Sequence, residues 1–268
     1  MTDNKGKLKI SWKQSAWLLW LVLPAMVGCV ASLQKRLPGT TVPPEEVFDV
    51  LKRLDDDLKT DKQIFRVRML DKGRTFSGDG ALVYRSPDTL QMSIYGPPFT
   101  TLWMQLLSRG DSITVVLPKD NRVVRAVRSD TDPISELADS RGLTDAEFLG
   151  GVTGIYQIER FFYPTMVAAA AEEGQILRLR LSDDQTAYEF AYDKVLDAVV
   201  RFARYEKGRL NREIIRSDFK DVQGMQRAGK TVYRDYLADR EITVLVGKEE
   251  INLDLQDSSF EIILPEDS

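Results

Sequence analysis

Residue types that usually carry chemistry are scarce in this chain of 268 residues. It has no histidine, the commonest general base and zinc ligand, and only one cysteine, Cys29. A single thiol cannot form an internal disulfide or a cysteine metal cluster. The chemistry that remains belongs to Cys29 itself, to carboxylates and to serine–lysine pairs. We therefore expect no metal site, no cofactor and no catalytic residue.

The carboxylates give no sign of a convergent site. The densest acidic cluster, Asp55–Asp57, falls in a predicted helix, where three consecutive residues point in different directions and cannot share one ion. The sequence has no P-loop, dinucleotide fingerprint or Gly-x-Ser-x-Gly elbow. We predict that the protein is not an enzyme. The alternative, an envelope hydrolase, requires two carboxylates or a serine–lysine pair within hydrogen-bond reach in one cleft.

Cys29 ends a segment with the features of a secretion signal. Four lysines within residues 5–13 precede an apolar run of about a dozen residues, which is too short to span a bilayer comfortably. The small residue Gly28 stands directly before the cysteine. We expect residues 1–28 to be a signal peptide.

The sequence Val27-Gly28-Cys29 resembles the lipobox of bacterial lipoproteins, with Met26 where that family usually has leucine. The resemblance implies that Cys29 is acylated and becomes the mature N-terminus. Each buried methylene adds about 0.8 kcal/mol, so several chains make a durable anchor. Val30, rather than aspartate, follows the cysteine, which by resemblance to the enterobacterial sorting rule implies the periplasmic face of the outer membrane rather than the inner membrane. The alternative is an uncleaved membrane anchor with an incidental cysteine.

The remainder of the chain divides into a tether and one domain. Loss of residues 1–28 removes four lysines and one aspartate, so the formal charge falls from -4 to about -7. An acidic protein of this kind is not expected to bind nucleic acid, because phosphate binding requires a basic surface. Residues 29–44 contain three prolines and are expected to form a lipidated N-terminus and flexible tether. Residues 45–265 are long enough to bury one substantial core.

Periodicity predicts the elements of this domain. Pro43-Pro44-Glu45-Glu46 starts a helix with apolar residues at helical spacing. From Gln63 to Val127 the period is two, and short turns between the strands predict an antiparallel meander. Helix starts are expected at Asp132 and Leu143, and a helix or turn over Ile155–Phe162. Later strands are expected at 176–181, 187–192, 199–205, 211–217, 230–235, 241–246, 251–255 and 260–264.

Two patches resemble the LolA/LolB lipoprotein-localisation superfamily. Arg85–Leu102 has its pattern of strand, short loop and strand, and Asp257–Pro265 resembles its final strand followed by proline. The order of elements is similar as well. The resemblance implies a mainly β (α+β) fold, in which one strongly curved antiparallel sheet forms an incomplete β-barrel with helices covering the inside. It also implies an apolar cavity that receives acyl chains of lipoproteins or related lipids.

Two neighbouring strands supply a candidate wall for that cavity. Alternate residues of one strand share one face, and methionine adapts to chains of different shape. The alternative is that the wall packs as a closed core against the first helix. The wall residues are Leu90, Met92, Ile94, Leu102, Met104 and Leu106.

The loop between these strands is a candidate membrane probe. In the membrane-anchored receptor of the superfamily an apolar residue at the tip of the matching loop touches the bilayer. The resemblance implies that the probe loop here contains Pro97, Pro98 and Phe99, with Pro98 or Phe99 as the counterpart of that residue. Two prolines stiffen the loop. The alternative is that Phe99 folds inward and caps the core.

The resemblance also implies a function. It implies a lipid-anchored cell-envelope protein that binds acyl chains and assists lipoprotein or lipid localisation at the outer membrane. The expected partners are acyl chains, a periplasmic carrier protein and the membrane, which the protein contacts through its N-terminal lipid. The alternative is a structural or interaction lipoprotein of an envelope assembly, its barrel filled by its own core. Carriers of the superfamily close the cavity with an arginine, and candidates are Arg66, Arg68, Arg74 and Arg85.

Cys29→Ser should leave the domain folded but unacylated, because the tether separates the anchor from the core. Incorporation of labelled palmitate and sensitivity of processing to globomycin measure this. A wild-type protein that takes up no label would contradict the lipoprotein assignment.

Overall fold

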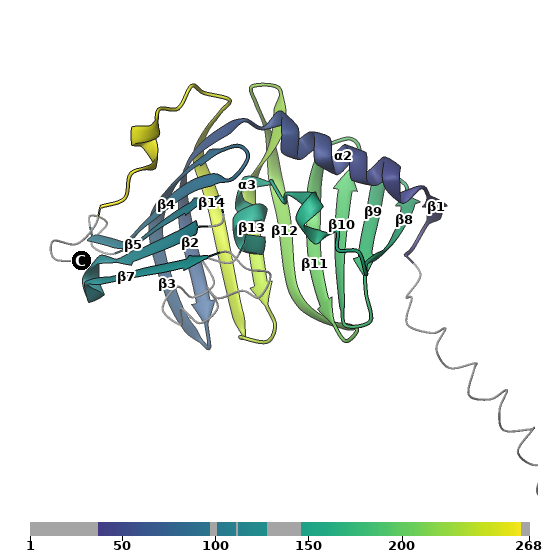
Figure 1. Ribbon diagram of the computed structural model, residues 1–268, viewed down its shortest axis with the longest axis horizontal. Coiled ribbons are helices and arrows are strands. Elements are labelled where there is room, and N and C mark those ends of the chain that lie inside the picture. The colour runs from purple at the N-terminus through teal and green to yellow at the C-terminus, as the bar shows by residue number, and fades with distance from the viewer. Residues whose placement is uncertain (1–36, 97–100, 111, 128–145, 264–268) are drawn as a thin grey trace, which may run out of the picture. The chain divides into compact units, whose positions relative to one another are not determined.

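The protein is described by a computed structural model over residues 37–96, 101–110, 112–127 and 146–263 (Figure 1). All of them belong to one compact unit that begins at Leu37. The predicted lipidation site Cys29, the loop residues Pro97, Pro98 and Phe99, and the helix starts at Asp132 and Leu143 lie outside the described residues.

A single antiparallel sheet of 14 strands forms this unit, in the order β1-β8-β9-β10-β11-β12-β13-β14-β2-β3-β4-β5-β6-β7. Two meanders, β2–β7 and β8–β14, are joined by pairing of β14 with β2, and the sheet does not close on itself. The prediction of one curved antiparallel sheet is confirmed. The strands are β1 Thr40–Val42, β2 Thr60–Asp71, β3 Arg74–Arg85, β4 Thr89–Gly96, β5 Thr101–Arg109, β6 Ser112–Leu117, β7 Arg122–Val127, β8 Val167–Glu173, β9 Ile176–Ser182, β10 Thr186–Asp193, β11 Ala198–Glu206, β12 Arg209–Val222, β13 Met225–Asp235 and β14 Arg240–Ile251.

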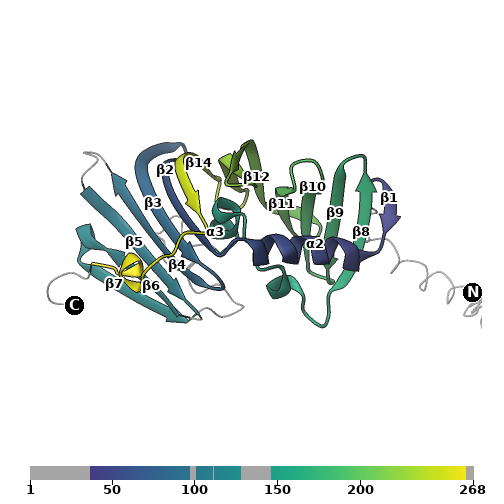
Figure 2. The same cartoon turned by 90° about the horizontal axis from the view of Figure 1, so that it is seen from above.

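Helices cover one face of the sheet, which we call the inner face. Helix α2 (Pro44–Asp57) starts at the predicted proline, with acidic residues in its first turn where the helix dipole favours them, and buries Val47 and Leu51. Figures 1 and 2 show it lying across the strands from β8 to β11. Helix α3 (Ala146–Thr153) lies against β12 and β13. The 3-10 turns are η1 Pro118–Asp120, η2 Ile158–Phe161 and η3 Asp257–Phe260.

Alternation decides which side chains reach the inner face. In β2, Phe65, Val67 and Met69 are buried and the residues between them are exposed. Val67 and Met69 face Val244 and Ile242 across the β14–β2 ladder, which carries the apolar face from one meander into the other. The core is therefore one continuous cluster.

The C-terminal segment covers the outer face of β4. It does not form the strands predicted at 251–255 and 260–264, so both predictions are wrong over the described residues. Strand β14 ends at Ile251, because Asn252 takes a left-handed conformation (φ 52°) that turns the chain out of the sheet. The chain then forms η3 and buries Phe260. Gln105 accepts a hydrogen bond from the backbone N–H of Ile263 at 2.8 Å.

Two strands were missed by the sequence prediction. Strand β1 lies in the predicted tether and pairs with β8, with Thr40 opposite Glu172. Strand β8 lies in a segment predicted to lack strands. Its run of four alanines has no strand signal of its own, and pairing with its two neighbours decides its conformation.

No helix in the described part of the chain is both long and apolar enough to cross a bilayer.

Candidate functional site

The predicted wall lies on the inner face. Strands β4 and β5 pair so that Met92 stands opposite Leu106 and Ile94 opposite Met104. These four side chains and that of Leu90 are at most 6% exposed. These five residues belong to the core cluster, and two pockets lined entirely by described residues lie elsewhere.

Leu102 does not share this wall, which corrects the sequence prediction. The register shifts between Ile94 and Tyr95, so that Leu102 stands opposite Tyr95 while Met104 stands opposite Ile94. Cross-strand partners share a face, so Leu102 lies with Tyr95 on the outer face. The extra residue is Trp103, whose ring lies over Gly96 on the inner face. Period-two alternation cannot foresee such a bulge.

The other half of the inner face is filled by aromatic rings. Tyr156 and Phe161 pack on Phe190 and Phe202, with ring centroids 5.4 to 5.6 Å apart. Phe161 also meets Tyr188 at 4.9 Å. Helix α2 covers this half. The inner face thus has an aromatic half over β9–β11 and an aliphatic half over β2–β5.

Buried charges hold the C-terminal end of α3. The Nη2 of Arg227 donates to the backbone oxygen of Thr153 at 2.6 Å and to Asp61 Oδ2 at 2.7 Å. Its Nε donates to Glu249 Oε1 at 2.6 Å. Gln63 donates to Asp61 at 2.7 Å and to the oxygen of Val152 at 3.4 Å. Side chains of three strands therefore hold the last turn of the helix.

Two carboxylates of this cluster, those of Asp61 and Glu249, pair with one arginine, Arg227. Burial raises the pKa of Asp61 to about 7, against the opposing effect of Arg227, and Glu249 raises it further. Burial also lowers the pKa of nearby Arg216 to about 10. Among the described residues, Asp61 Oδ1 and Glu249 Oε2 have no hydrogen-bond partner. Asp61 therefore takes up a proton more readily than an ordinary aspartate does.

The first turn of α3 is fixed in the same way. Glu147 accepts hydrogen bonds from Arg204 at 3.2 Å and from Arg212 at 3.4 Å, and its side chain is 8% exposed. Buried ion pairs gain little net stability because both charges lose their hydration, but they select one position for the helix.

The arginines that touch the inner helix are not those predicted. Arg66, Arg68 and Arg74 are exposed, and Arg85 pairs with Asp257. Arg227 was missed by the sequence prediction. It lies four residues before the buried Thr231 in β13, so the alternation of the strand puts both side chains on the same face. The predicted strand 230–235 begins after Arg227, so only the longer observed strand, Met225–Asp235, places this arginine on the inward side.

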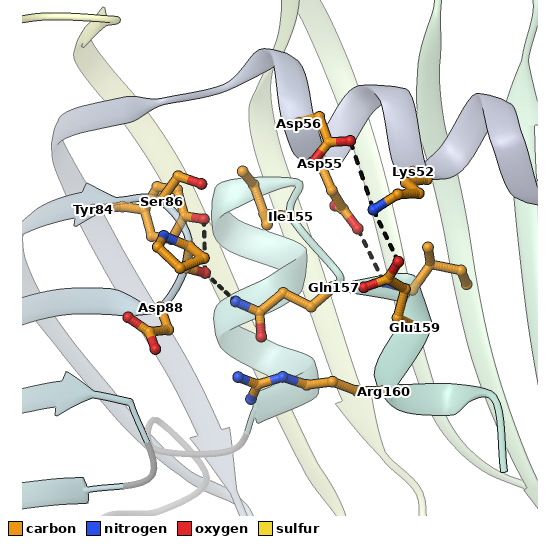
Figure 3. A pocket seen from close by; sticks show the side chains of 12 residues that line it. Lys52, Asp55, Asp56, Tyr84, Ser86, Asp88, Ile155, Gln157, Glu159 and Arg160 are labelled. Carbon is orange, nitrogen blue, oxygen red and sulfur yellow. Dashed lines mark hydrogen bonds and ion pairs between the residues drawn. The ribbon is translucent and has the colours of Figure 1, made fainter.

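A polar pocket of about 240 Å³ lies where α2, the β3–β4 turn and η2 meet (Figure 3). Tyr84 lines it and stands opposite Leu90, so the pocket adjoins one end of the wall. Asp55 accepts the backbone N–H groups of Tyr156 and Ile158 at 3.0 and 2.9 Å. Burial raises the pKa of Asp55 to about 6, and these hydrogen bonds oppose the shift.

The groups of this pocket do not form a hydrolytic site. Each oxygen of Asp55 is engaged by a backbone N–H. Lys52 pairs with Glu159 at 2.8 Å, which raises the pKa of Lys52 and keeps it protonated, so it cannot act as a base. No group of three or more acidic, histidine or cysteine side chains in the described part of the chain could hold a metal ion.

Known structures share this architecture. A DUF1329 family protein from Desulfovibrio piger superposes with a TM-score of 0.61 and 13% identity, over 82% of this chain and 97% of that one. A putative outer membrane lipoprotein-sorting protein domain from Vibrio parahaemolyticus superposes with a TM-score of 0.57 and 15% sequence identity, over 81% of this chain and 97% of that one. A LolA superfamily protein from Nitrosomonas europaea superposes with a TM-score of 0.55 and 13% sequence identity, over 80% of this chain and 97% of that one.

These similarities define the fold. No protein-family model and no curated protein sequence matches the chain. The protein nevertheless has the LolA-like fold, an open and incomplete barrel of antiparallel strands with helices on its inner face. The expectation drawn from the two sequence patches is confirmed at the level of the fold.

Asp61→Asn should change how stability depends on pH. Because the pKa of Asp61 is higher in the folded protein than its ordinary value, the folded state binds more protons between the two values. The free energy of unfolding therefore falls as pH rises from about 4 to about 7. Asparagine does not titrate, so the stability of the wild type relative to this variant should increase as pH is lowered through this window.

Urea unfolding at several pH values measures the difference, with the exposed Asp254→Asn as control. Parallel pH profiles for the wild type and Asp61→Asn would contradict the assignment.

Proposed function

We propose that this protein is a lipid-anchored envelope protein whose half-barrel accepts an acyl chain on the aliphatic half of its inner face. It assists the placement of lipoproteins or lipids at the outer membrane. The observation that carries the proposal is the apolar surface formed by β2–β5, where Phe65, Val67, Met92, Ile94 and Met104 adjoin one another. The LolA-like fold supports it.

Transfer of hydrocarbon supplies the free energy, and no covalent chemistry is needed. Each methylene moved from water is worth about 0.8 kcal/mol, so about ten methylenes give on the order of 8 kcal/mol. Methionine side chains adapt to chains of different shape. We propose that Cys29 holds the protein on the periplasmic face of the outer membrane, and that a periplasmic carrier delivers the chain.

Acyl binding requires the inner face to open. Met92 and Leu106 are fully buried, so an incoming chain must displace groups that now cover them.

A second candidate is a structural lipoprotein that docks in an envelope assembly. The complete burial of the same wall favours it, since a filled barrel has no need to open. Native mass spectrometry of the protein purified from its own membrane separates the two. Co-purified acyl species support the carrier, whereas protein free of lipid that also binds no added palmitate supports the structural role.

Met92→Trp should abolish binding of a fluorescent fatty acid at little cost in stability, because a wall that parts for a chain also accommodates an indole. The matched change Leu179→Trp, on the aromatic half, should cost about 1–3 kcal/mol by overpacking and leave binding unchanged. Titration and thermal unfolding of both variants measure this. A large loss of stability in Met92→Trp with fatty-acid binding retained would contradict the proposal.

Phe99→Glu should reduce liposome association of the unacylated protein while changing the free energy of unfolding by less than about 0.5 kcal/mol, as expected for an exposed residue. Phe162→Glu, at a phenylalanine that is 49% exposed elsewhere, is the control and should leave liposome association unchanged. Vesicle flotation and thermal unfolding are the measurements. A marked fall in melting temperature with unchanged flotation would identify Phe99 as a core residue.

A further inference from the structure

The polar pocket holds one positive and one negative charge that are not neutralised by an ion pair. Lys52, which also lines it, pairs with Glu159 at 2.8 Å. Arg160 and Asp88 line the same pocket but form no ion pair and no side-chain hydrogen bond with a described residue. These two groups of opposite sign can therefore bind a ligand without breaking an existing pair.

Both of these charges lie near the hydroxyl group of Tyr84. Burial raises the pKa of Tyr84 to about 12, Asp88 adds to the rise and Arg160 opposes it. Figure 3 shows the guanidinium of Arg160 pointing into the pocket on the side where Asp88 lies. A ligand that carries a charge of each sign can thus meet both groups at once.

Gln157 spans the pocket from a strained backbone position. Its φ of 51° is left-handed, and Asp55 fixes this conformation by accepting the backbone N–H groups of Tyr156 and Ile158 on either side. Its side-chain amide donates to the backbone oxygen of Pro87, which ties η2 to the β3–β4 turn (Figure 3). Strained non-glycine residues of this kind cluster at ligand clamps and active sites.

The pocket is continuous with the core at one end of the wall. Tyr84, Ile155 and Ile158 line the pocket and also belong to the core cluster, and Tyr84 stands opposite Leu90. An acyl chain whose polar end lies at Leu90 brings its headgroup to the pocket. The volume of about 240 Å³ is below the roughly 300–1,000 Å³ of sites for drug-sized ligands, so it suits a headgroup and not a whole lipid.

The charges of the pocket select among headgroups. A headgroup with net negative charge is disfavoured, because four carboxylates line the pocket against two cations. A phosphate accepts charge-assisted hydrogen bonds from the guanidinium of Arg160, and a primary ammonium donates them to Asp88. A quaternary ammonium has no N–H to donate. The charged lining residues are Lys52, Asp55, Asp56, Asp88, Glu159 and Arg160.

We propose that this pocket binds the phosphoethanolamine headgroup of a phospholipid whose acyl chain lies on the aliphatic half, with the phosphate at Arg160 and the ammonium at Asp88. The inference rests on the proposed acyl binding and adds the ligand class, a zwitterionic phospholipid with a primary ammonium group. It also gives the orientation of the ligand, with its polar end beside Tyr84.

The first test compares ligands that share one palmitoyl chain and differ in the headgroup. The full chain is titrated calorimetrically with palmitoyl lysophosphatidylethanolamine, lysophosphatidylcholine, lysophosphatidylglycerol and uncharged palmitoylglycerol, each below its critical micelle concentration. We expect the ethanolamine lipid to bind about tenfold more tightly than the glycerol lipid and palmitoylglycerol, since each charge-assisted contact is worth about 1.4 kcal/mol or more. The choline lipid should fall between them.

Free glycerophosphoethanolamine distinguishes a lipid from a soluble headgroup as the source of this chemistry. It should bind far more weakly than the lysolipid, because it lacks the chain. Equal affinity of the two would overturn the assignment to a phospholipid.

Two variants of the full chain separate the contacts. Arg160→Gln should weaken the ethanolamine and glycerol lysolipids about tenfold, because both carry the phosphate. Asp88→Asn should weaken the ethanolamine lipid, strengthen the glycerol lipid and so remove the preference between them. Both should leave palmitoylglycerol binding and the melting temperature unchanged. Arg209→Gln, at an exposed arginine that does not line the pocket, is the matched control and should change none of these affinities.

The outcomes separate the inference from the proposed function. Equal binding of all four palmitoyl ligands, or tighter binding of the glycerol lipid, would overturn the headgroup site and leave acyl binding intact. If either variant fails to fold, this ranking by the wild type decides alone. Absence of binding by every palmitoyl ligand would overturn both the inference and the proposed function.

Discussion

The inner face of an open sheet must be kept from water, and the rest of this structure depends on that constraint. A closed barrel protects its interior by itself, but these 14 strands leave one broad apolar face that other groups must cover. Helix α2 and the rings of Tyr156 and Phe161 cover the strands from β8 to β11, and α3 covers β12 and β13. The aliphatic half over β2–β5 is the part where we propose that an acyl chain replaces the present cover.

Different interactions hold the cover of the aromatic half and helix α3. The aromatic half is held by contacts of the rings of Tyr156 and Phe161 with those of Phe190 and Phe202. Helix α3 instead relies on Glu147 at one end and on Arg227 with its two carboxylates at the other. Such pairs specify a position more than they stabilise it. The helix that these charges position lies over β12 and β13, between the aromatic half and the aliphatic half in the strand order.

The sequence predicted most of the sheet because alternation and short turns are local signals. It failed where non-local pairing decides the conformation, as in the alanine-rich β8, and where one backbone dihedral ends a strand, as at Asn252. It also failed at Leu102, since one extra residue in β5 exchanges the faces of all residues beyond it. The cluster around Arg227 joins residues distant in sequence, and no pairwise spacing reveals it.

The central claim is that an acyl chain lies on the aliphatic half of the inner face. Methyl-labelled methionine gives the most direct measurement, because Met92 and Met104 lie on that half, whereas Met166 and Met225 lie outside it. The account predicts that added palmitate shifts the methyl signals of Met92 and Met104 and gives cross-relaxation between them and the chain, with the other two unchanged. Bound palmitate whose contacts fall on Met166 or Met225 instead would contradict it.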